Sequence, residues 1–264
     1  MKIAAWLVVK DEEYYVDMAI KSVAPYVDGV YVQDQYSTDN TAEIIEASIG
    51  STPLRIDKIN IGLEKFNRQY NEPFYRSLAI SCCEEHFKPD WILQIDGDEI
   101  YTPQFFETVK KLDQSGELSK YNGVRHATER FIAPQYYAQN LRALQTVNGQ
   151  TYHDPHTRFW RAGRDVRYVS NPGIKGFFHC IPRPQPDPIL WIPGIMHIHL
   201  HRTFGPKAFP FWKEGGDLFE QTVPFNPKQQ APKWFDKNME EAVFTDFQWP
   251  DYVMEKWNKW GCYD

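Results

Sequence analysis

Two acidic side chains, Asp96 and Asp98, stand on either side of Gly97 and directly follow the apolar run at residues 91–95. A hard divalent cation prefers oxygen ligands, and one that bridges a diphosphate takes only one or two carboxylates from the protein. Glycine permits a sharp turn between the acids and removes bulk where a pyrophosphate would approach. The pattern predicts a cation site for a phosphorylated ligand; the alternative is a solvated acidic turn after a strand.

Three histidines, His197, His199 and His201, recur at every second residue. On a strand this spacing places all three on one face. A neutral imidazole could complete the shell of a cation, and His199 is the preferred candidate, followed by His197 and then His201. A half-exposed strand with alternating polar side chains is the competing interpretation.

Other polar residues also follow predicted strands or flank them. Asp34 closes the run at 29–33, and ligands of open α/β sheets bind beyond the carboxyl ends of the strands. Asp39 belongs to the Ser-Thr-Asp-Asn cluster at 37–40, which predicts a helix cap rather than a catalytic acid. Arg158 and Arg161 could meet phosphate or merely flank a strand.

The elements that position these residues alternate over the first 112 residues. Apolar runs at 3–9, 29–33, 54–59 and 91–95 predict strands, and helical patterns at 12–24, 41–48 and 73–86 predict helices between them. A fourth helix is expected to start near Pro103. This alternation is typical of βαβ units around a mostly parallel sheet.

The pattern changes beyond residue 120. Short strand-like segments at 124–132, 157–160 and 195–200 are separated by glycine and proline. The prolines at 182, 184, 186, 188 and 193 exclude a helix and predict an extended crossing. We expect one domain with two halves, residues 1–115 and 116–264, of which the second is a mixed sheet with long loops.

Composition limits the classes of partner. The net charge of −6 argues against duplex nucleic acid, because such binding depends on Lys and Arg neutralising phosphates. The apolar run at 3–9 is too short for a membrane span and has no cleavage pattern, so no transmembrane segment is expected. The four cysteines, at 82, 83, 180 and 262, lack zinc or disulfide spacing and indicate reduced thiols in the cytoplasm.

An ordered series of motifs connects these observations. The sequence has Val-Val-Lys-Asp-Glu-Glu at 8–13, Asp-Gln-Tyr-Ser-Thr-Asp-Asn-Thr at 34–41, Arg76, and Trp-Ile-Leu-Gln-Ile-Asp-Gly-Asp-Glu at 91–99. Together they resemble the family 2 glycosyltransferases of GT-A fold, especially the branch with a Lys-Asn-Glu-Glu start and an Asp-Ala-Asp-Glu metal motif. These motifs span residues 8–99, and the resemblance is thin beyond residue 120.

The resemblance implies a fold and a reaction. The fold would be GT-A, a Rossmann-like α/β fold with a mostly parallel sheet and helices on both faces, followed by a mixed-sheet, loop-rich C-terminal half. The reaction would transfer a sugar from a nucleotide-diphosphate donor (UDP, GDP or dTDP) to a hydroxyl acceptor such as a glycan. Mn²⁺ or Mg²⁺ would be the cofactor, and the anomeric carbon would usually invert. The half 1–115 would bind the nucleotide-sugar and the half 116–264 the acceptor.

The resemblance implies a role for three residues of this chain. Asp98 would be the principal metal ligand, and Asp96 would bind the ribose or a metal-bound water. Arg76 would face the diphosphate. The resemblance also implies a late metal-binding histidine, for which His199 and His197 are candidates. The residues expected to contact the nucleotide-sugar are Val9, Glu12, Asp34, Arg76, Asp96 and Gly97. In the family an Asp-Asp pair usually stands here, and its second acid often contacts the nucleobase. Gln35 replaces that acid, so the resemblance does not specify the nucleobase of the donor.

Inversion needs a carboxylate that deprotonates the acceptor hydroxyl. Glu129 and Asp154, both in the second half, are the candidates. The proline-rich stretch 181–193 and the aromatic segment 204–219 are expected to border the acceptor and to become more ordered when the donor binds. Gly205, Gly215 and Gly216 would be the hinges.

Two other classes of protein stay open. A haloacid-dehalogenase-like phosphatase also has an apolar strand followed by two aspartates, but it usually carries this motif near the start of the chain, with Thr or Val where Ile100 stands. A non-catalytic carbohydrate-binding protein would use the aromatic residues, 16% of the chain, as a platform for sugar rings. The sequence has no glycine-rich dinucleotide or phosphate-loop motif.

Overall fold

The structure is a computed structural model that describes residues 1–59, 68–133, 136–138, 144–147, 150–153, 156–171, 179–200, 242–244 and 246–260. Within these residues, ten strands form one sheet that contains strands from both halves of the chain. The order and register of these strands determine which side chains meet at the acidic turn, residues 95–98.

Four parallel strands form the first part of the sheet. They are β1 (Ile3–Val9), β2 (Gly29–Asp34), β3 (Leu54–Lys58) and β4 (Trp91–Gln94), in the order β3-β2-β1-β4. β1 is buried at every position except Val8, which is half-buried, as expected for a parallel strand covered on both faces. The four strands predicted from apolar runs are confirmed, to within a residue at their ends.

Helices cover both faces of these strands. Alternate side chains of β1 point to opposite sides of the sheet. Ala5 and Leu7 join an apolar cluster with side chains of α1 (Val16–Val23), α2 (Thr41–Ser48) and α4 (Pro103–Gln114), whereas Ala4 and Trp6 pack against α3 (Arg68–Phe87). α4 begins with Pro103, at a position where the missing N–H costs no helical hydrogen bond. The predicted arrangement of helices on both faces is confirmed.

Two helix boundaries differ from the prediction. α1 begins at Val16 rather than at residue 12, because residues 12–15 form a turn in which Tyr15 N–H donates to the carbonyl of Glu12 (3.0 Å). α3 begins at Arg68, so Pro73 lies inside the helix rather than at its start. Pro73 is the sixth residue of α3, so the helix lacks the hydrogen bond that an N–H at this position would donate to the preceding turn.

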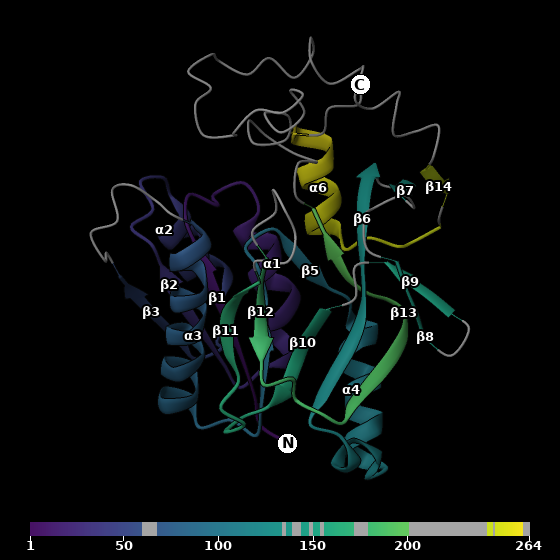
Figure 1. Ribbon diagram of the computed structural model, residues 1–264. Helices are drawn as coiled ribbons and strands as arrows, with labels where there is room; N and C mark the ends of the chain where they lie inside the picture. Colours follow the sequence, from purple (N-terminus) through teal and green to yellow (C-terminus); the bar gives the residue numbers. More distant parts are fainter. Residues whose placement is uncertain are drawn as a thin grey trace.

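The second part of the sheet is mixed. β10 (His156–Arg161) lies antiparallel to β4, and β6 (Gly123–Ala133) lies antiparallel to β10. β13 (Ile189–His199) is parallel to β6 and antiparallel to β5 (Glu99–Tyr101). In Figure 1 the parallel strands lie on the left, and β6, β13 and α4 lie on the right. The sheet is therefore continuous from the first half into the second.

The register between β13 and β5 brings histidines to the acidic turn. His197 pairs with Tyr101, and His199 pairs with Glu99. β5 begins at Glu99 and β4 ends at Gln94, so the turn at residues 95–98 joins these two strands. Two segments about 100 residues apart in the sequence thus meet at one end of the sheet.

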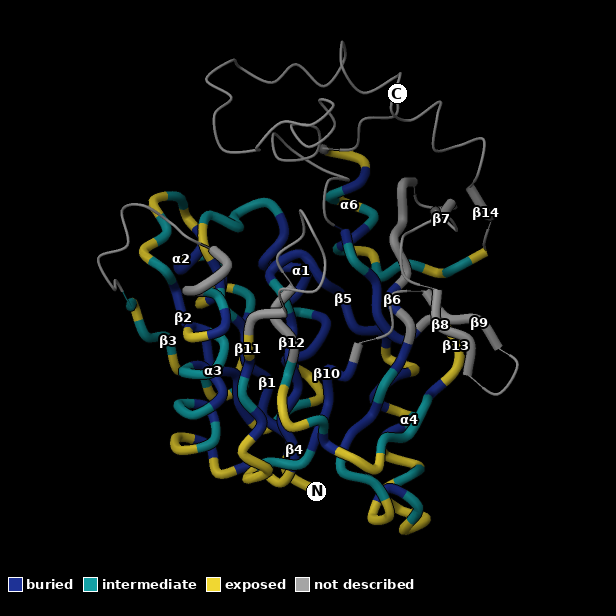
Figure 2. The backbone as a smooth tube through the Cα atoms, in the orientation of Figure 1, coloured by how far each residue is buried: buried dark blue, intermediate teal, exposed yellow. Residues whose placement is uncertain are grey.

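The remaining described elements border this sheet. They are β7 (Tyr136–Ala138) with β14 (Ala242–Phe244), the pair β8 (Leu144–Val147) and β9 (Gln150–His153), the pair β11 (Arg167–Asn171) and β12 (His179–Arg183), the 3-10 turns Ala24–Tyr26 and Glu117–Lys120, and α6 (Asp251–Trp260). Val253 and Trp257 of α6 pack against Ile100 and Ile198. α6 therefore covers β5. Figure 2 shows that the buried residues lie along the central strands of the sheet.

The proline-rich stretch is extended where it is described. β12 ends at Arg183, and β13 begins at Ile189, so no helix forms there, as predicted. The segment 204–219, with Gly205, Gly215 and Gly216, lies outside the described residues. Among the described helices, none is long and apolar enough to cross a membrane.

Candidate active site

The acidic turn is anchored on two sides by main-chain hydrogen bonds. Ile95 N–H donates to the carbonyl of Trp6 on β1 (3.1 Å), and Leu200 N–H, just beyond β13, donates to the carbonyl of Asp98 (2.8 Å). The turn is therefore fixed to the parallel strands and to the mixed strands at once. A rigid support of this kind is what a binding carboxylate requires.

Asp96 is held by two guanidinium groups. Its Oδ1 accepts from Nη1 of Arg76 (2.8 Å), and its Oδ2 accepts from Nη1 of Arg158 (3.1 Å). Burial alone would raise the pKa of Asp96, but the charges of Arg76 and Arg158 outweigh it and hold the pKa well below the usual range. Arg76 itself is steadied by Glu72, whose carboxylate accepts from its Nε (3.0 Å). Asp96 is thus an ionised acid with both oxygens engaged.

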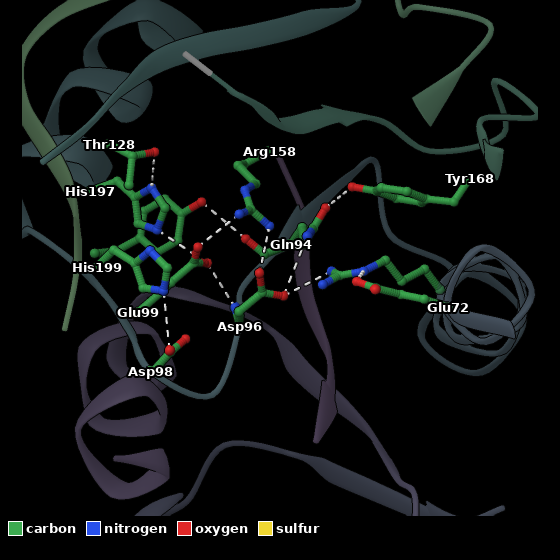
Figure 3. Close-up of polar contacts among 12 residues, drawn as sticks. Glu72, Gln94, Asp96, Asp98, Glu99, Thr128, Arg158, Tyr168, His197 and His199 are labelled. Carbon is green, nitrogen blue, oxygen red and sulfur yellow. Dashed lines mark hydrogen bonds and ion pairs between the residues drawn. The ribbon is translucent and has the colours of Figure 1, made fainter. Parts of the chain in front are cut away.

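Glu99 extends this network into the sheet (Figure 3). Its Oε2 accepts from the main-chain N–H of Asp96 (2.8 Å), and its Oε1 accepts from Nη2 of Arg158 (2.7 Å). Burial would raise the pKa of Glu99, but Arg158 outweighs this effect, and the net shift is downward. Burial would likewise lower the pKa of Arg158, and the two acids reverse that shift. The guanidinium is therefore a permanent charge between two carboxylates.

His197 lies against the same acid. Its Nε2 lies 3.1 Å from Oε2 of Glu99, its Nδ1 lies 3.0 Å from the hydroxyl of Thr128, and its side chain is fully buried. Burial lowers the pKa of His197 despite the nearby carboxylate, so the ring is neutral at neutral pH. With both ring nitrogens next to protein groups, His197 is oriented toward Glu99 rather than toward Asp98.

Asp98 and His199 face each other at the edge of this network. Nε2 of His199 lies 3.1 Å from Oδ2 of Asp98, and the two side chains are 22% and 11% exposed. They are more accessible than Glu99, whose side chain is 1% exposed. Of the two histidines predicted to bind a metal, His199 is the one that contacts an acid of the predicted metal motif near the surface.

The pair can accommodate a divalent cation. Two neighbouring ligands in an octahedral shell of ~2.1 Å lie about 3 Å apart, which matches the 3.1 Å between Asp98 and His199. One carboxylate and one imidazole are also a donor set that Mn²⁺ accepts. Among the described residues there is no group of three or more His, Cys, Asp or Glu that could hold a metal alone. Asp98 and His199 would therefore need the oxygens of a bound ligand to complete the shell.

Gly97 allows close packing beneath the turn. A Cβ at this position would lie 2.9 Å from Cγ of Glu12 and 3.4 Å from Cγ1 of Val9. The structure thus brings together Val9, Glu12 and Gly97, three residues predicted to contact the nucleotide-sugar. The Glu12 side chain occupies the space that a side chain at position 97 would need.

Asp34 lies at the end of β2, beside Val9 of β1. Its Oδ1 accepts from both the N–H (2.8 Å) and the hydroxyl (2.7 Å) of Ser37. Its Oδ2 is buried and has no hydrogen-bond partner among the described residues. Because a buried acceptor without a donor costs free energy, this oxygen is suited to receive a donor group from a ligand. Gln35, the neighbour that replaces the usual second acid, is tied to Val9 through its main-chain N–H (2.9 Å).

Some predicted residues are not brought to this site by the described structure. Asp154 and His201 lie outside the described residues, and Glu129 belongs to β6, where its side chain is not described. Arg161 donates to the carbonyl of Tyr121 (2.9 Å) and lies over the ring of Trp91, with 4.9 Å between its Cζ and the ring centre. Arg161 therefore flanks its strand, which was one of its two predicted interpretations.

Sequence reasoning did not identify the inner part of the network. No partner was predicted for Glu99, and Arg158 was expected either to meet phosphate or to flank a strand. In the structure Arg158 binds both Glu99 and Asp96. Thr128 was not considered, and Gln94, which hydrogen-bonds to the hydroxyl of Tyr168, was quoted only within a motif. A basic residue directly before the aromatic pair Phe159-Trp160 was the one available signal, and it did not specify a partner.

Comparison with solved structures shows the GT-A fold. Staphylococcus aureus TarS superposes with a TM-score of 0.50 at 14% identity, over 76% of this chain and 37% of that one. TarS 1-349 in complex with UDP-GlcNAc has a TM-score of 0.46 at 14% identity, over 94% of this chain and 68% of that one. Glucosyl-3-phosphoglycerate synthase from Mycobacterium tuberculosis, in complex with Mn²⁺ and UDP-glucose, has a TM-score of 0.35 at 20% identity, over 48% of this chain and 43% of that one.

The likeness is one of fold rather than of sequence. This chain spans 61% of the first TarS 1-349 structure and a smaller share of full TarS. No family model matches the sequence, and no curated protein matches it. The GT-A architecture expected from the motifs is thus confirmed, and TarS and the mycobacterial synthase are GT-A glycosyltransferases.

Proposed function

We propose that this protein is a metal-dependent glycosyltransferase that moves a sugar from a nucleotide-diphosphate donor to a hydroxyl acceptor. The observation that carries the proposal is the contact between Asp98 and His199, 3.1 Å apart, at the carboxyl end of the parallel strands. Ligands of open α/β sheets bind at this end. The GT-A fold that the chain shares with TarS supports the same interpretation.

Asp98 and His199 would hold the cation, Mn²⁺ or Mg²⁺, and the donor diphosphate would complete its shell. Bound there, the cation would supply Lewis-acid stabilisation of the departing nucleoside diphosphate. The side chain of Asp96 is 23% exposed and that of Asp98 is 11% exposed, so accessibility does not decide between them. The difference is that both oxygens of Asp96 are engaged by arginines. Asp96 would therefore accept from a ribose hydroxyl or a metal-bound water rather than serve as the main ligand.

The nucleoside would lie along the ends of β1 and β2. Asp34 offers one buried oxygen without a partner among the described residues, which would accept a hydrogen bond from the base. Val9 and Glu12 line the adjoining turn next to Gly97. Arg76, whose side chain is 14% exposed, would turn toward the diphosphate. Because Gln35 is neutral, the base itself, uracil, guanine or thymine, is left for experiment.

The acceptor would be a hydroxyl, of a glycan or a similar compound, and attack would occur in line with inversion. Glu129 and Asp154 stay candidates for the base that removes the acceptor proton. NMR of the product would test inversion, because retained configuration would contradict it.

The arrangement of Asp96 favours a transferase over a phosphatase. In a haloacid-dehalogenase-like enzyme the first aspartate of the motif is the nucleophile, and it needs a free oxygen to attack phosphorus. Here each oxygen of Asp96 accepts from a guanidinium. A nucleophile so strongly paired would be a poor one, because its lowered pKa reflects stabilisation of its negative charge.

A panel of UDP-, GDP- and dTDP-sugars tests the proposal. We expect one base class to raise the melting temperature with Mn²⁺ present, because a ligand that binds only the folded state stabilises it. The same donor should show slow hydrolysis or transfer that a chelator abolishes. Release of phosphate from simple monoesters would indicate the phosphatase, and stabilisation by free glycans without any nucleotide-sugar would indicate a binding protein.

A further inference from the structure

We infer that Arg158 is a positioning residue that aims Asp98 and His199 at the cation, and that it does not contact the donor. The inference deepens the proposed function and rests on it. Arg158 comes from β10, in the second half of the chain, whereas the acids that it bridges belong to the turn between β4 and β5.

Arg158 closes a ring around the acidic turn (Figure 3). Its two Nη atoms bind Asp96 (3.1 Å) and Glu99 (2.7 Å), and Glu99 in turn accepts from the main-chain N–H of Asp96 (2.8 Å). Asp98 lies between these two acids in the sequence. Both flanking acids are held by the same guanidinium, and the carbonyl of Asp98 accepts from the N–H of Leu200 (2.8 Å), so the main chain that carries Asp98 is held on both sides.

The same network of contacts extends to β13, the strand that carries His197 and His199. Glu99 lies 3.1 Å from His197, whose other ring nitrogen contacts Thr128. His197 and His199 are two residues apart on β13 and share one face of the strand. The contact that orients His197 therefore helps to set the position of His199 beside Asp98.

Arg158 is too enclosed to bind phosphate directly. The residue is 8% exposed, both Nη atoms are engaged by carboxylates, and the remaining Nε is buried without a partner among the described residues. Arg76 binds Asp96 and, on its own helix, Glu72, whereas Arg158 binds Asp96 and Glu99. Arg158 is therefore the arginine that connects the two acids flanking Asp98.

The experiment separates positioning from stability and from phosphate binding. Arg158→Met alone leaves Glu99 buried without its main counter-charge, so the decisive variant is Glu99→Gln combined with Arg158→Met, which removes both buried charges. Arg161→Met is the matched control, because Arg161 lies on the same strand and binds main-chain carbonyls instead. Mn²⁺ affinity is measured by electron paramagnetic resonance with UDP present at saturation, or with GDP or dTDP if the donor panel selects that base, because Asp98 and His199 need ligand oxygens to complete the shell. Affinity for the same nucleotide is measured by calorimetry at saturating Mn²⁺, and folding by thermal melting.

We expect the double variant to melt near the wild type and to bind Mn²⁺ about 10- to 100-fold more weakly, the loss typical when groups that orient metal ligands are removed. Its UDP affinity at saturating Mn²⁺ should be close to that of the wild type. Arg161→Met should bind Mn²⁺ as the wild type does.

Three outcomes would overturn the inference. Unchanged Mn²⁺ affinity in a folded double variant would show that Arg158 does not position the ligands. Weak UDP binding that persists at saturating Mn²⁺ would show that Arg158 contacts the phosphates. If the wild type binds Mn²⁺ with none of UDP, GDP and dTDP, the proposed function fails and this inference fails with it, whereas the first two outcomes leave the proposed function intact.

Discussion

The carboxyl end of the sheet has two rims that hold their acids in different ways. We call residues 10–15 and 34–41 the β1–β2 rim, and residues 94–99 with Arg76, Arg158, His197 and His199 the β4–β5 rim. In the β1–β2 rim, carboxylates accept from neutral groups: Asp11 from the N–H of Thr38 (2.7 Å) and Asp39 from the N–H of Thr41 (3.0 Å). In the β4–β5 rim, carboxylates face guanidinium and imidazole groups.

The two rims also differ in how far apart their partners lie in the sequence. Asp11 and Thr38 are 27 residues apart, on loops that follow neighbouring parallel strands. Glu99 and Arg158 are 59 residues apart, and Asp98 and His199 are 101 apart. The first rim forms once two βα units are in place, whereas the second requires the mixed strands to pair in register. We therefore expect changes in the second rim to have larger effects.

The largest effect is expected from Asp98→Asn. The amide is nearly isosteric but a far weaker ligand for a hard cation. A loss of about 4 kcal/mol of transition-state stabilisation would slow transfer roughly a thousandfold. Folding stability should change by only about 0.5 to 1 kcal/mol, because the lost contact with His199 is partly exposed. Transfer rates and melting curves with the best donor measure the two effects.

Asp96→Asn should also lower the transfer rate, but by a smaller factor than Asp98→Asn. The two variants are assayed together with the same donor. Near-normal transfer by Asp98→Asn, or full wild-type activity in excess chelator, would remove the metal site from the proposed mechanism.

Arg158→Met, as a single change, should have the largest effect on stability. Removing one partner of a buried charge pair typically costs about 3 to 5 kcal/mol, and for a chain of this size that lowers the melting temperature by roughly 10 °C. Arg55→Met is the contrast, because Arg55 pairs with Asp57 (2.7 Å) on β3 with a side chain that is 52% exposed. An exposed pair of this kind contributes about 1 kcal/mol or less. Equal shifts in the two variants would contradict the expectation that the buried pairs of Arg158 in the β4–β5 rim contribute more to stability than an exposed pair outside both rims.

Asp39→Ala should have a smaller effect, and on stability alone. Asp39 accepts from the N–H of Thr41, the first residue of α2, and from the N–H of Glu13 (3.2 Å). Losing these bonds should cost about 1 to 2 kcal/mol and leave transfer unchanged, as expected for a residue at a helix start. Urea denaturation and a transfer assay measure this. A lost reaction with normal stability would instead make Asp39 a catalytic acid.

The contrast between the rims also explains how much could be predicted. Strands β1, β2 and β4 were predicted because their runs of apolar side chains are local and they are buried at nearly every position. β3, Leu-Arg-Ile-Asp-Lys, has no buried position, and its alternating pattern was the signal. Asp96, Asp98 and His199 were predicted as site candidates from strand ends, alternate spacing and the resemblance, and the structure places Asp98 beside His199. These signals need only the secondary structure of one segment at a time.

The ring of Asp96, Glu99 and Arg158 could not be predicted in the same way. It depends on the pairing of β10 with β4 and on the register that sets His199 opposite Glu99. No local pattern specifies that register, since Arg158 would be just as plausible at a phosphate. The start of α3 was misplaced for a different reason. Proline is common at the first position of a helix, which is where it was assigned, whereas Pro73 is the sixth residue of α3.

The smallest expected effects come from two residues with left-handed backbone, one in the β1–β2 rim and one outside both rims. Tyr36 has a φ of 54° and Lys88 a φ of 47°. A side chain in this region costs about 1 to 2 kcal/mol, while glycine costs about 0.5 to 1 kcal/mol in lost chain entropy. Tyr36→Gly and Lys88→Gly should therefore each stabilise the fold slightly, by about 0.5 kcal/mol.

The two variants should differ in nucleotide binding. Tyr36 keeps its strained backbone although its ring is 49% exposed, so packing does not compensate for the strain. Strain without burial is common where a side chain serves a ligand, and Tyr36 follows Asp34 by two residues at the end of β2. Stacking of a base on an aromatic ring contributes about 1 to 3 kcal/mol. If UDP is the donor nucleotide, Tyr36→Gly should therefore weaken UDP binding roughly fivefold or more. Lys88→Gly, at the end of α3, should leave UDP binding unchanged. Calorimetry with UDP and Mn²⁺ measures both. Equal affinities for wild type and Tyr36→Gly would mean that the ring has no part in binding, and the β1–β2 rim would then contribute only through Asp34 and its neighbours.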